Sequence, residues 1–239
     1  MPETETEAEA ETAAEAETAA TAAAPIDPAS LDEQELHAAR ESLIAVARRA
    51  FETGLQTNAG GNLSVRLRSV DACVIKPSGI GFAEVSHDNL MVCDLEGRTV
   101  LGHHKPSKDK DFHCAIYRLR PDVGAIVHVH SSWATAWGCA GRTVPLLTVQ
   151  SIEKMGTIPL VPLGENGGPQ GAAEIGEAMA SPDMRVCLLA NHGTVGVART
   201  ALKALHLCEI LEETAKTAAI AEALAGGSPI AMPSRGVRA

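Results

Sequence analysis

The chain has 239 residues, a formal net charge of −10 and only 3% aromatic residues. Residues 1–24 contain seven Glu and no Lys or Arg, so the other 215 residues carry a net charge of about −3. This nearly balanced body has neither the basic patches nor the stacking aromatic side chains of nucleic-acid-binding proteins. Its apolar runs are far shorter than the roughly 20 residues that span a bilayer. We therefore expect neither nucleic acid nor membrane as a partner.

The composition divides the chain into three parts. Residues 1–25 are rich in Glu, Ala and Thr and offer no large side chain for a core, which predicts a disordered acidic tail. Residues 26–227 are long enough for one catalytic domain, and residues 228–239 predict an irregular C-terminal tail. The start of the chain lacks the basic and apolar stretches of a signal peptide. Six cysteines without a CxxC motif predict free buried thiols and a cytoplasmic location.

The N-terminal part of the domain predicts a helix and then a strand. Ser30 and Glu33 have the spacing of a capping box, in which the Ser30 side chain bonds the amide of Glu33. Apolar residues at nearly helical spacing then run to Gly54. Residues 62–67 alternate between apolar and polar side chains, which predicts a half-buried strand.

The rest of the domain alternates between strands and helices. Apolar runs predict strands at residues 72–75, 90–94, 123–130, 158–161 and 185–190. A turn is expected at residues 96–98, and helices are expected at 108–119, before Pro121, and at 200–224, before Gly226. This alternation predicts a single-domain α/β fold with three α/β/α layers.

Three histidines stand where strands end. His128 and His130 are two residues apart, so a strand presents both imidazoles on one face, at a spacing that suits a shared metal ion. Two histidines on a solvated strand face would look the same. His192 follows a buried strand and precedes Gly193, a position where α/β folds collect ligands. The alternative for His192 is a capping or core histidine.

A polar segment precedes the helix predicted at 108–119. Ser107, Lys108 and Asp109 offer a hydroxyl, an ammonium and a carboxylate at a helix entrance, where backbone N–H groups attract anions. A solvated charged cap is the simpler alternative. Asp111 is the other acid nearby, but in a helix it lies about 200° around the axis from Asp109, so only one can face a site.

Four segments together resemble the class II aldolase/adducin-head family, in its L-fuculose-phosphate aldolase-like branch. They are "NAGGNLSVRL" (58–67), "VIKPSGIGF" (74–82), "HKPSKDKDFHCAIYRLRPDVGAIVHVHS" (104–131) and "LLANHGTVGV" (188–197), in the family's order. The resemblance covers about residues 31–225. It implies a central, mainly antiparallel or mixed sheet between helical layers. It also implies a homotetramer with active sites at subunit interfaces.

The resemblance also implies the site. Zn²⁺, or Mn²⁺ or Co²⁺ in its place, would bind His128, His130 and His192, with Asp109 as a fourth ligand and as the proton carrier. Lys108 and Lys110 are expected to favour the charged form of Asp109. Gly60 and Gly61 would let an anion approach the backbone closely. The substrate's phosphate is expected among Asn62, Ser78, Gly79, Ser107 and Lys108.

The activity that the resemblance favours first is aldol cleavage of a ketose 1-phosphate to dihydroxyacetone phosphate and an aldehyde, through an enediolate. Asp109 replaces the Glu of aldolases and is similar to the 4-epimerases, whereas Lys108 is similar to 3-oxo-tetronate phosphate decarboxylases. No tyrosine follows Tyr117, so the family's tyrosine acid is absent, and Gln150 and Glu153 lie near its position. The alternatives are therefore a decarboxylase of a 3-oxo-tetronate phosphate or a dihydroxyaromatic acid, or a sugar-phosphate 4-epimerase. A non-catalytic adducin-like domain is more remote, because adducins lack the three histidines.

Overall fold

The computed structural model describes residues 24–162, 168–226 and 230, so the tails predicted for residues 1–25 and 228–239 lie almost wholly outside the described part. One sheet of eight strands has the order β4-β3-β2-β1-β5-β8-β7-β6. Every neighbouring pair is antiparallel except β6 and β7, which confirms the mainly antiparallel, mixed sheet. The strands are β1 (Asn62–Leu67), β2 (Ala72–Ile75), β3 (Met91–Asp94), β4 (Thr99–Leu101), β5 (Ala125–Val129), β6 (Leu160–Val161), β7 (Val186–Leu189) and β8 (Gly193–Ala198).

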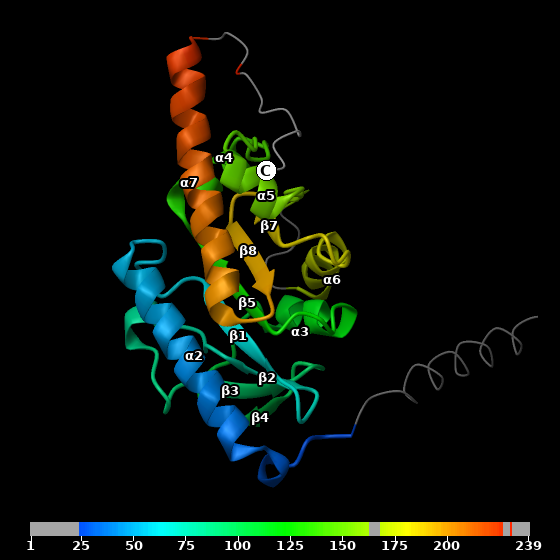
Figure 1. The fold of residues 1–239 in the computed structure, drawn as a ribbon. Coiled ribbons are helices and arrows are strands. Elements are labelled where there is room, and N and C mark those ends of the chain that lie inside the picture. Colours follow the sequence, from blue (N-terminus) through cyan, green and yellow to red (C-terminus); the bar gives the residue numbers. More distant parts are fainter. Residues whose placement is uncertain (1–23, 163–167, 227–229, 231–239) are drawn as a thin grey trace, which may run out of the picture.

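Helices cover both faces of this sheet, as the predicted three layers require (Figure 1). The helices are η1 (Pro28–Ser30), α2 (Glu33–Glu52), η2 (Phe82–Glu84), α3 (Lys110–Leu119), α4 (Ser132–Cys139), α5 (Val149–Met155), α6 (Pro169–Ala178) and α7 (Ala201–Ala225). On one face α2 and α7 bury a cluster that includes Leu43, Leu63 and Leu205. On the other face α3 and α6 pack against each other over a second cluster, which includes Ile116 and Ile126.

Strand β1 corrects one prediction. It was expected to be half-buried, with its polar side chains in solvent, but Asn62 and Ser64 are only 2% and 0% exposed. The reason is that α3, distant in sequence, covers this face, while Leu63 and Leu67 face the opposite cluster under α2 and α7. Two buried polar side chains on a central strand need hydrogen-bond partners. Those partners belong to the candidate site.

The cap of α2 corrects a second prediction. The helix begins at Glu33, and its N-cap is Asp32, whose Oδ1 accepts from the amide of Glu35 at 2.8 Å. Ser30 instead ends the 3₁₀ turn η1, and its hydroxyl donates to the carbonyl of Asp27 at 2.6 Å. The predicted capping box at Ser30 is therefore wrong by two residues, because the short turn displaces the start of the helix.

The last helix agrees with the sequence. Helix α7 begins after Thr200, whose side chain accepts from the amide of Lys203, and ends at Gly226 with φ of 58°. The left-handed conformation favours glycine at this position. A third hydrophobic cluster joins α4 and α5 to α7 and β7. Figure 1 shows the C-terminal end of α7, in red, reaching beyond the sheet.

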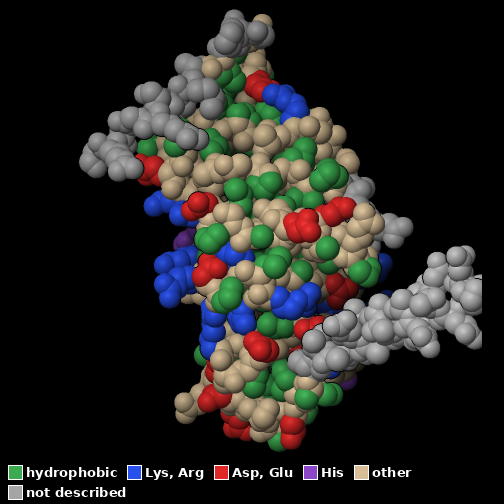
Figure 2. All heavy atoms as spheres, turned by 90° about the vertical axis from the view of Figure 1, so that its right-hand side faces the viewer, with side chains coloured by type: hydrophobic (Ala, Val, Ile, Leu, Met, Phe, Trp, Pro, Cys, Tyr) green, Lys and Arg blue, Asp and Glu red, His purple; other side chains and the backbone are tan. Residues whose placement is uncertain are grey.

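The surface is mixed in character. Figure 2 shows acidic, basic and hydrophobic side chains interspersed over one face. Among the helices that the structure describes, none combines the length and apolar character needed to cross a bilayer. All six cysteines are free, and five of them are buried as predicted, whereas Cys139 is exposed.

The correction at α2 gives a testable stability difference. Asp32→Ala removes the acceptor of the Glu35 amide and should lower the free energy of unfolding by about 1 kcal/mol. Ser30→Ala is the matched control and should change it by no more than about 0.5 kcal/mol. Urea unfolding followed by circular dichroism measures both. A larger loss in the Ser30 variant would contradict the assignment of Asp32 as the cap.

Candidate metal centre

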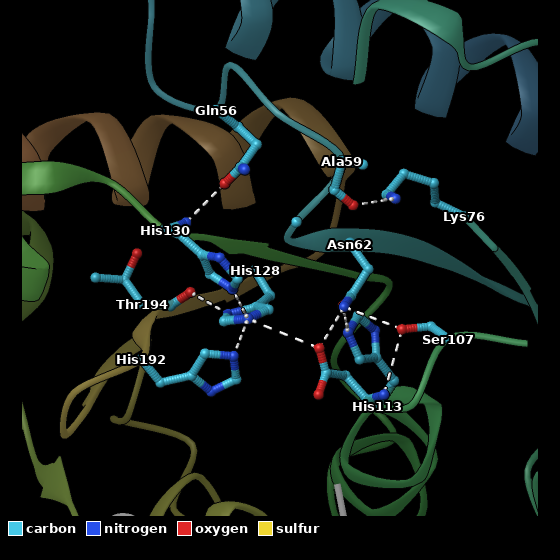
Figure 3. Close-up of polar contacts among 12 residues, drawn as sticks. Gln56, Ala59, Asn62, Lys76, Ser107, His113, His128, His130, His192 and Thr194 are labelled. Atoms are coloured by element: carbon cyan, nitrogen blue, oxygen red, sulfur yellow. Dashed lines mark hydrogen bonds and ion pairs between the residues drawn. The ribbon is translucent and has the colours of Figure 1, made fainter. Parts of the chain in front are cut away.

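Strand pairing brings the three predicted histidines to one end of the central strands (Figure 3). His128 on β5 lies opposite Asn62 of β1 on one side and Val195 of β8 on the other. His130 follows the last residue of β5, and His192 precedes the first residue of β8. Because β5 and β8 are antiparallel neighbours, the end of one strand meets the start of the other, and the imidazoles converge.

The spacing of the imidazoles suits one metal ion. Nε2 of His128 lies 3.0 Å from Nε2 of His130 and 3.3 Å from Nε2 of His192. Nitrogens bound at about 2.0–2.1 Å to one tetrahedral ion stand about 3.3 Å apart. Within the described part of the chain, His128, His130 and His192 form a group of metal-ligating side chains whose ligand atoms all lie within 4.8 Å of one another, close enough to share one ion.

The protonation of His128 also fits metal binding. Its Nδ1 lies 2.9 Å from the carbonyl oxygen of Thr194, which can only accept, so Nδ1 carries the hydrogen and Nε2 presents a lone pair. Burial, reinforced by the two neighbouring imidazoles, holds the pKa of His128 well below its usual range. Burial also lowers the pKa of His130. Neutral imidazole is the form that binds metal ions, so the donor set fits a divalent ion.

The backbone around the histidines is held by residues that the sequence analysis missed. Gln56 Oε1 accepts from the amide of His130 at 2.7 Å. Asn191 has φ of 55°, a left-handed conformation that asparagine adopts more readily than most residues, and it turns the chain into His192. A Cβ on Gly193 would lie 2.4 Å from the carbonyl oxygen of Val129. The Asn-His-Gly sequence is therefore the sequence of a tight turn that carries a ligand.

Asp109 lies at the histidines, as predicted. It precedes the first residue of α3, but its side chain makes no capping hydrogen bond to that helix. Instead Oδ2 accepts from Asn62 Nδ2 at 2.6 Å and lies 3.8 Å from His128 Nε2. Asp111 points elsewhere, forms an ion pair with Lys110 and lines a separate hollow beside α6. Lys110, which was expected to act on Asp109, thus has Asp111 as its ion-pair partner.

A cavity of about 250 Å³ opens over the cluster. It is lined by seven of the nine predicted site residues, namely Asn62, Ser78, Ser107, Lys108, Asp109, His130 and His192, together with Ala59, Gly60, Gly61, Lys76 and Pro77. His128 lies fully buried beneath it. Gly79 lines a neighbouring hollow with Phe51 and Phe82 instead. Gly60 also meets a histidine, since a Cβ there would lie 2.7 Å from His130 Nδ1.

The candidate replacements for the missing tyrosine do not reach this cavity. Gln150 lines a different cavity, which contains Arg199 and Lys203. Glu153 is exposed on α5 and does not line the cavity over the histidines. Tyr117 is fully buried, and its hydroxyl bonds Ser64 Oγ at 2.8 Å, so it does not reach the cavity either.

Lys76 is a pocket residue that the sequence analysis overlooked. Its side chain is 1% exposed, and Nζ donates to the carbonyls of Ala59, Pro77 and Ile80. Burial lowers the pKa of Lys76 to about 8, against the opposing effect of the Asp109 charge. The sequence held a signal for it, because a lysine directly after the wholly apolar run "ACVI" starts at a buried position, and lysines are rarely buried unless their charge is compensated.

His113 is a second overlooked residue. This α3 histidine is fully buried, with Nε2 2.6 Å from Asn62 Oδ1 and Nδ1 2.7 Å from Ser64 Oγ. Burial lowers the pKa of His113 to about 3. It therefore stays neutral in the folded protein at every pH where the protein is assayed.

Three convergent imidazoles beside a carboxylate and a cationic pocket define a metal-dependent enzyme for small anionic substrates. The sequence matches the family described as the Class II Aldolase and Adducin N-terminal domain over residues 41–219. The chain belongs to this family and is a metal-dependent enzyme of sugar-phosphate chemistry.

Its relatives carry more than one activity. The chain is 34% identical over 184 residues to a 3-oxo-tetronate 4-phosphate decarboxylase of Haemophilus influenzae, a match that covers 75% of this chain and 86% of that protein. It is 31% identical over 173 residues to a 5-deoxy-D-ribulose 1-phosphate aldolase of Bacillus thuringiensis, covering 72% and 80%. The solved structure of an L-fuculose 1-phosphate aldolase is similar with a TM-score of 0.76 and 30% identity, covering 82% of this chain and 91% of that one.

The geometry predicts how metal content responds to mutation. His128→Ala should remove most of the bound divalent ion, because it deletes the buried ligand whose Nε2 lies within 3.3 Å of both other Nε2 atoms. His87→Ala, at an exposed loop histidine, is the matched control and should retain the metal. Elemental analysis of the folded proteins gives the stoichiometry. One ion per chain in a His128/His130 double variant would exclude this ligand set.

The buried histidines predict acid sensitivity in the metal-free protein. His113 has a folded-state pKa of about 3, below the unfolded value near 6.5, so its stabilisation is present above pH 6.5 and is lost as pH falls toward 3. His113→Gln removes this titration. Between about pH 4 and 6 it should reduce the slope of unfolding free energy against pH by about 1.4 kcal/mol per pH unit. Urea titrations across this range measure the slope, and an unchanged slope would show that His113 is protonated when folded.

Proposed function

We propose that this chain is a divalent-metal-dependent carbon–carbon lyase, and that decarboxylation of a 3-oxo acid phosphate is its reaction. The observation that carries the proposal is a single carboxylate, Asp109, set 3.8 Å from a metal-ligating imidazole in a pocket that also contains two lysines. Such a pocket suits a substrate that carries more negative charge than a ketose 1-phosphate, because a 3-oxo acid phosphate is anionic at both ends.

The histidines prepare the site for an electrophile. A divalent ion on His128, His130 and His192, zinc by preference, would supply a Lewis acid to the oxo group of the substrate. The chain's own part is to hold three imidazoles convergent, with the pKa of His128 and of His130 lowered by burial. Thr194 keeps Nε2 of His128 turned inward through its carbonyl, and Gln56 fixes the backbone of His130.

We assign the phosphate of the substrate to the side of the pocket opposite the histidines. Ser78, Ser107 and Lys108 line it there with hydroxyl and ammonium groups. All three Nζ hydrogens of Lys76 have carbonyl acceptors, so this buried ammonium contributes its charge rather than a free donor. Lys108 is exposed at the mouth of the pocket and can donate directly to a phosphate.

The number of proton-transferring groups in the pocket favours decarboxylation. When carbon dioxide leaves, the electrons of the broken bond stay on the substrate carbon, and one proton must be delivered to that carbon. Asp109 is the one carboxylate that lines the described pocket, and it is placed to carry that proton. Aldol cleavage needs a base for the substrate hydroxyl and an acid for the carbon, and Tyr117 is buried in the core. The 34% identity to a 3-oxo-tetronate 4-phosphate decarboxylase supports the same choice.

Aldol cleavage of a ketose 1-phosphate to dihydroxyacetone phosphate and an aldehyde is the second candidate. The likeness to a 5-deoxy-D-ribulose 1-phosphate aldolase and to an L-fuculose 1-phosphate aldolase supports it. In that reaction Asp109 would take the hydroxyl proton and return it to carbon. Assembly as a homotetramer with sites at subunit interfaces is part of the proposal in either case.

The two candidates separate in one assay. The purified protein, loaded with zinc, manganese or cobalt, is incubated with 3-oxo-tetronate 4-phosphates and with ketose 1-phosphates. Carbon dioxide and dihydroxyacetone phosphate are both measured. We expect carbon dioxide from the oxo acids at a kcat/KM at least ten times that for cleavage of the ketoses. Dihydroxyacetone phosphate as the dominant product would assign the aldolase reaction instead.

Asp109 has a matched control in the same segment. Asp109→Asn keeps the shape of the side chain but cannot carry the proton, so kcat should fall about 10²–10⁴-fold. Asp111→Asn, at the acid that faces α6, should leave kcat within about twofold. Lys108→Ala should act mainly on KM if the ammonium binds the phosphate equally in ground and transition states. Normal turnover in Asp109→Asn beside an inactive Asp111→Asn would transfer the role to Asp111.

A further inference from the structure

Two secondary structures interlock behind Asp109. Asp109, His113 and Tyr117 are four residues apart, so they form one stripe along α3. Asn62 and Ser64 are two residues apart on β1, so they share one face of the strand. The two rows meet between sheet and helix, and each side chain of one row contacts members of the other.

The contacts form an unbroken buried chain of hydrogen bonds. The hydroxyl of Tyr117 lies 2.8 Å from Ser64 Oγ, and Ser64 Oγ lies 2.7 Å from His113 Nδ1. His113 Nε2 lies 2.6 Å from Asn62 Oδ1. Asn62 Nδ2 in turn donates to Asp109 Oδ2 at 2.6 Å. Except for Asp109, every member is at most 3% exposed.

The direction of every hydrogen in this chain follows from one end. A carboxylate can only accept, so Asn62 must turn its NH₂ group toward Asp109 and its carbonyl oxygen toward His113. That oxygen can only accept, so His113 carries its hydrogen on Nε2. Nδ1 then needs a donor, which is the Ser64 hydroxyl. Ser64 in turn accepts from the hydroxyl of Tyr117.

We propose that His113 is a positioning residue, which locks the amide of Asn62 so that its NH₂ group holds Asp109 toward the histidine cluster. The proposal rests on the proposed function, in which Asp109 carries the proton. It assigns a purpose to the single tyrosine of the chain, which anchors the far end of the hydrogen-bond chain. It makes Asn62 an organiser of two pocket groups, since Nδ2 also donates to Ser107 Oγ at 3.1 Å.

Without the donor on His113 the Asn62 amide is held only on its NH₂ side, by Asp109 and Ser107, and it can rotate more easily. A flipped Asn62 would place its carbonyl oxygen against the Asp109 carboxylate, and two acceptors repel each other. Asp109 would then turn away from the histidine cluster. A displacement of about 1 Å at a catalytic group can cost about 10²-fold in rate. The loss should appear in kcat rather than KM, because Asp109 acts in the chemical step.

The first test uses metal-free protein and needs no substrate. In ¹⁵N-histidine-labelled protein, NMR shifts of the ring nitrogens report which nitrogen of His113 carries the hydrogen. We expect a neutral ring with the hydrogen on Nε2, unchanged from pH 5 to 8. The spectrum of His113→Gln assigns the resonance. A ring with its hydrogen on Nδ1 would overturn the proposal, whatever reaction the enzyme catalyses.

The second test is kinetic. His113→Leu removes donor and acceptor together, and we expect kcat to fall about 100-fold with KM changed less than threefold. His113→Gln keeps an amide donor and acceptor and should recover at least tenfold of that loss. Ile116→Val, at another buried residue of α3, is the control for packing and should leave kcat within about twofold. A folded His113→Leu enzyme with kcat within threefold of the parent would refute the positioning role.

Ser64→Ala keeps the tests decisive if His113→Leu does not fold. It removes only the hydroxyl that donates to Nδ1, while Asp109 and Asn62 still require the hydrogen on Nε2, so His113 should keep the Nε2–H form by NMR but be held less firmly. We expect a smaller fall in kcat, about tenfold. If the parent enzyme shows no lyase activity at all, the proposed function fails, and the NMR result alone decides the direction of the hydrogen bonds. A His113 ring with its hydrogen on Nδ1 in Ser64→Ala would show that Asp109 and Asn62 do not set the direction of the hydrogen bonds and would overturn the proposal.

Discussion

The hydrogen bond between His128 Nδ1 and the carbonyl of Thr194 is the constraint on which the site depends. It joins β5 to β8 across the sheet, where His128 pairs with Val195 and Val129 pairs with Thr194. A shift of either strand by one residue would turn the imidazole to the opposite face of the sheet. The central pairing that builds the core therefore also selects the nitrogen that faces the pocket. Metal binding and folding are two consequences of one strand register.

The electrostatics of the pocket follow from the same burial. Burial lowers the pKa of His128 and of His130, so both imidazoles are neutral, and the charged side chains beside them are Asp109, Lys76 and Lys108. Lys76 is surrounded by backbone carbonyls, which is how a buried ammonium is tolerated without a carboxylate partner. The loops at residues 59–61 and 76–80 are tied together by the same lysine. One side chain thus sets both the charge of the pocket and the shape of its wall.

The sequence predicted what local periodicity and spacing determine. Six of the eight described strands, the long helix ending at Gly226, the three histidines and Asp109 were located from the residues or from the resemblance they carry, whereas β4 and β8 were not predicted. What it missed depends on contacts distant along the chain. Neither Lys76 nor His113 belongs to a short motif, and the burial of each is decided by segments 17 to 51 residues away. The half-buried strand and the Ser30 cap were wrong for similar reasons, since α3 covers β1 and a short turn moves the start of α2.

The meshing of α3 with β1 has an evolutionary consequence. A stripe of period four and a row of period two coincide along only a few residues, and a single insertion in either element would separate the polar partners. The length and register of β1 and of α3 are therefore constrained together. Pro77, Ser78 and Lys108 line the pocket without belonging to either row, so substitutions there can alter substrate contacts and leave the hydrogen-bond chain intact. In this fold the loop residues that line the pocket can vary with the substrate, whereas the buried hydrogen-bonded residues of α3 and β1 cannot.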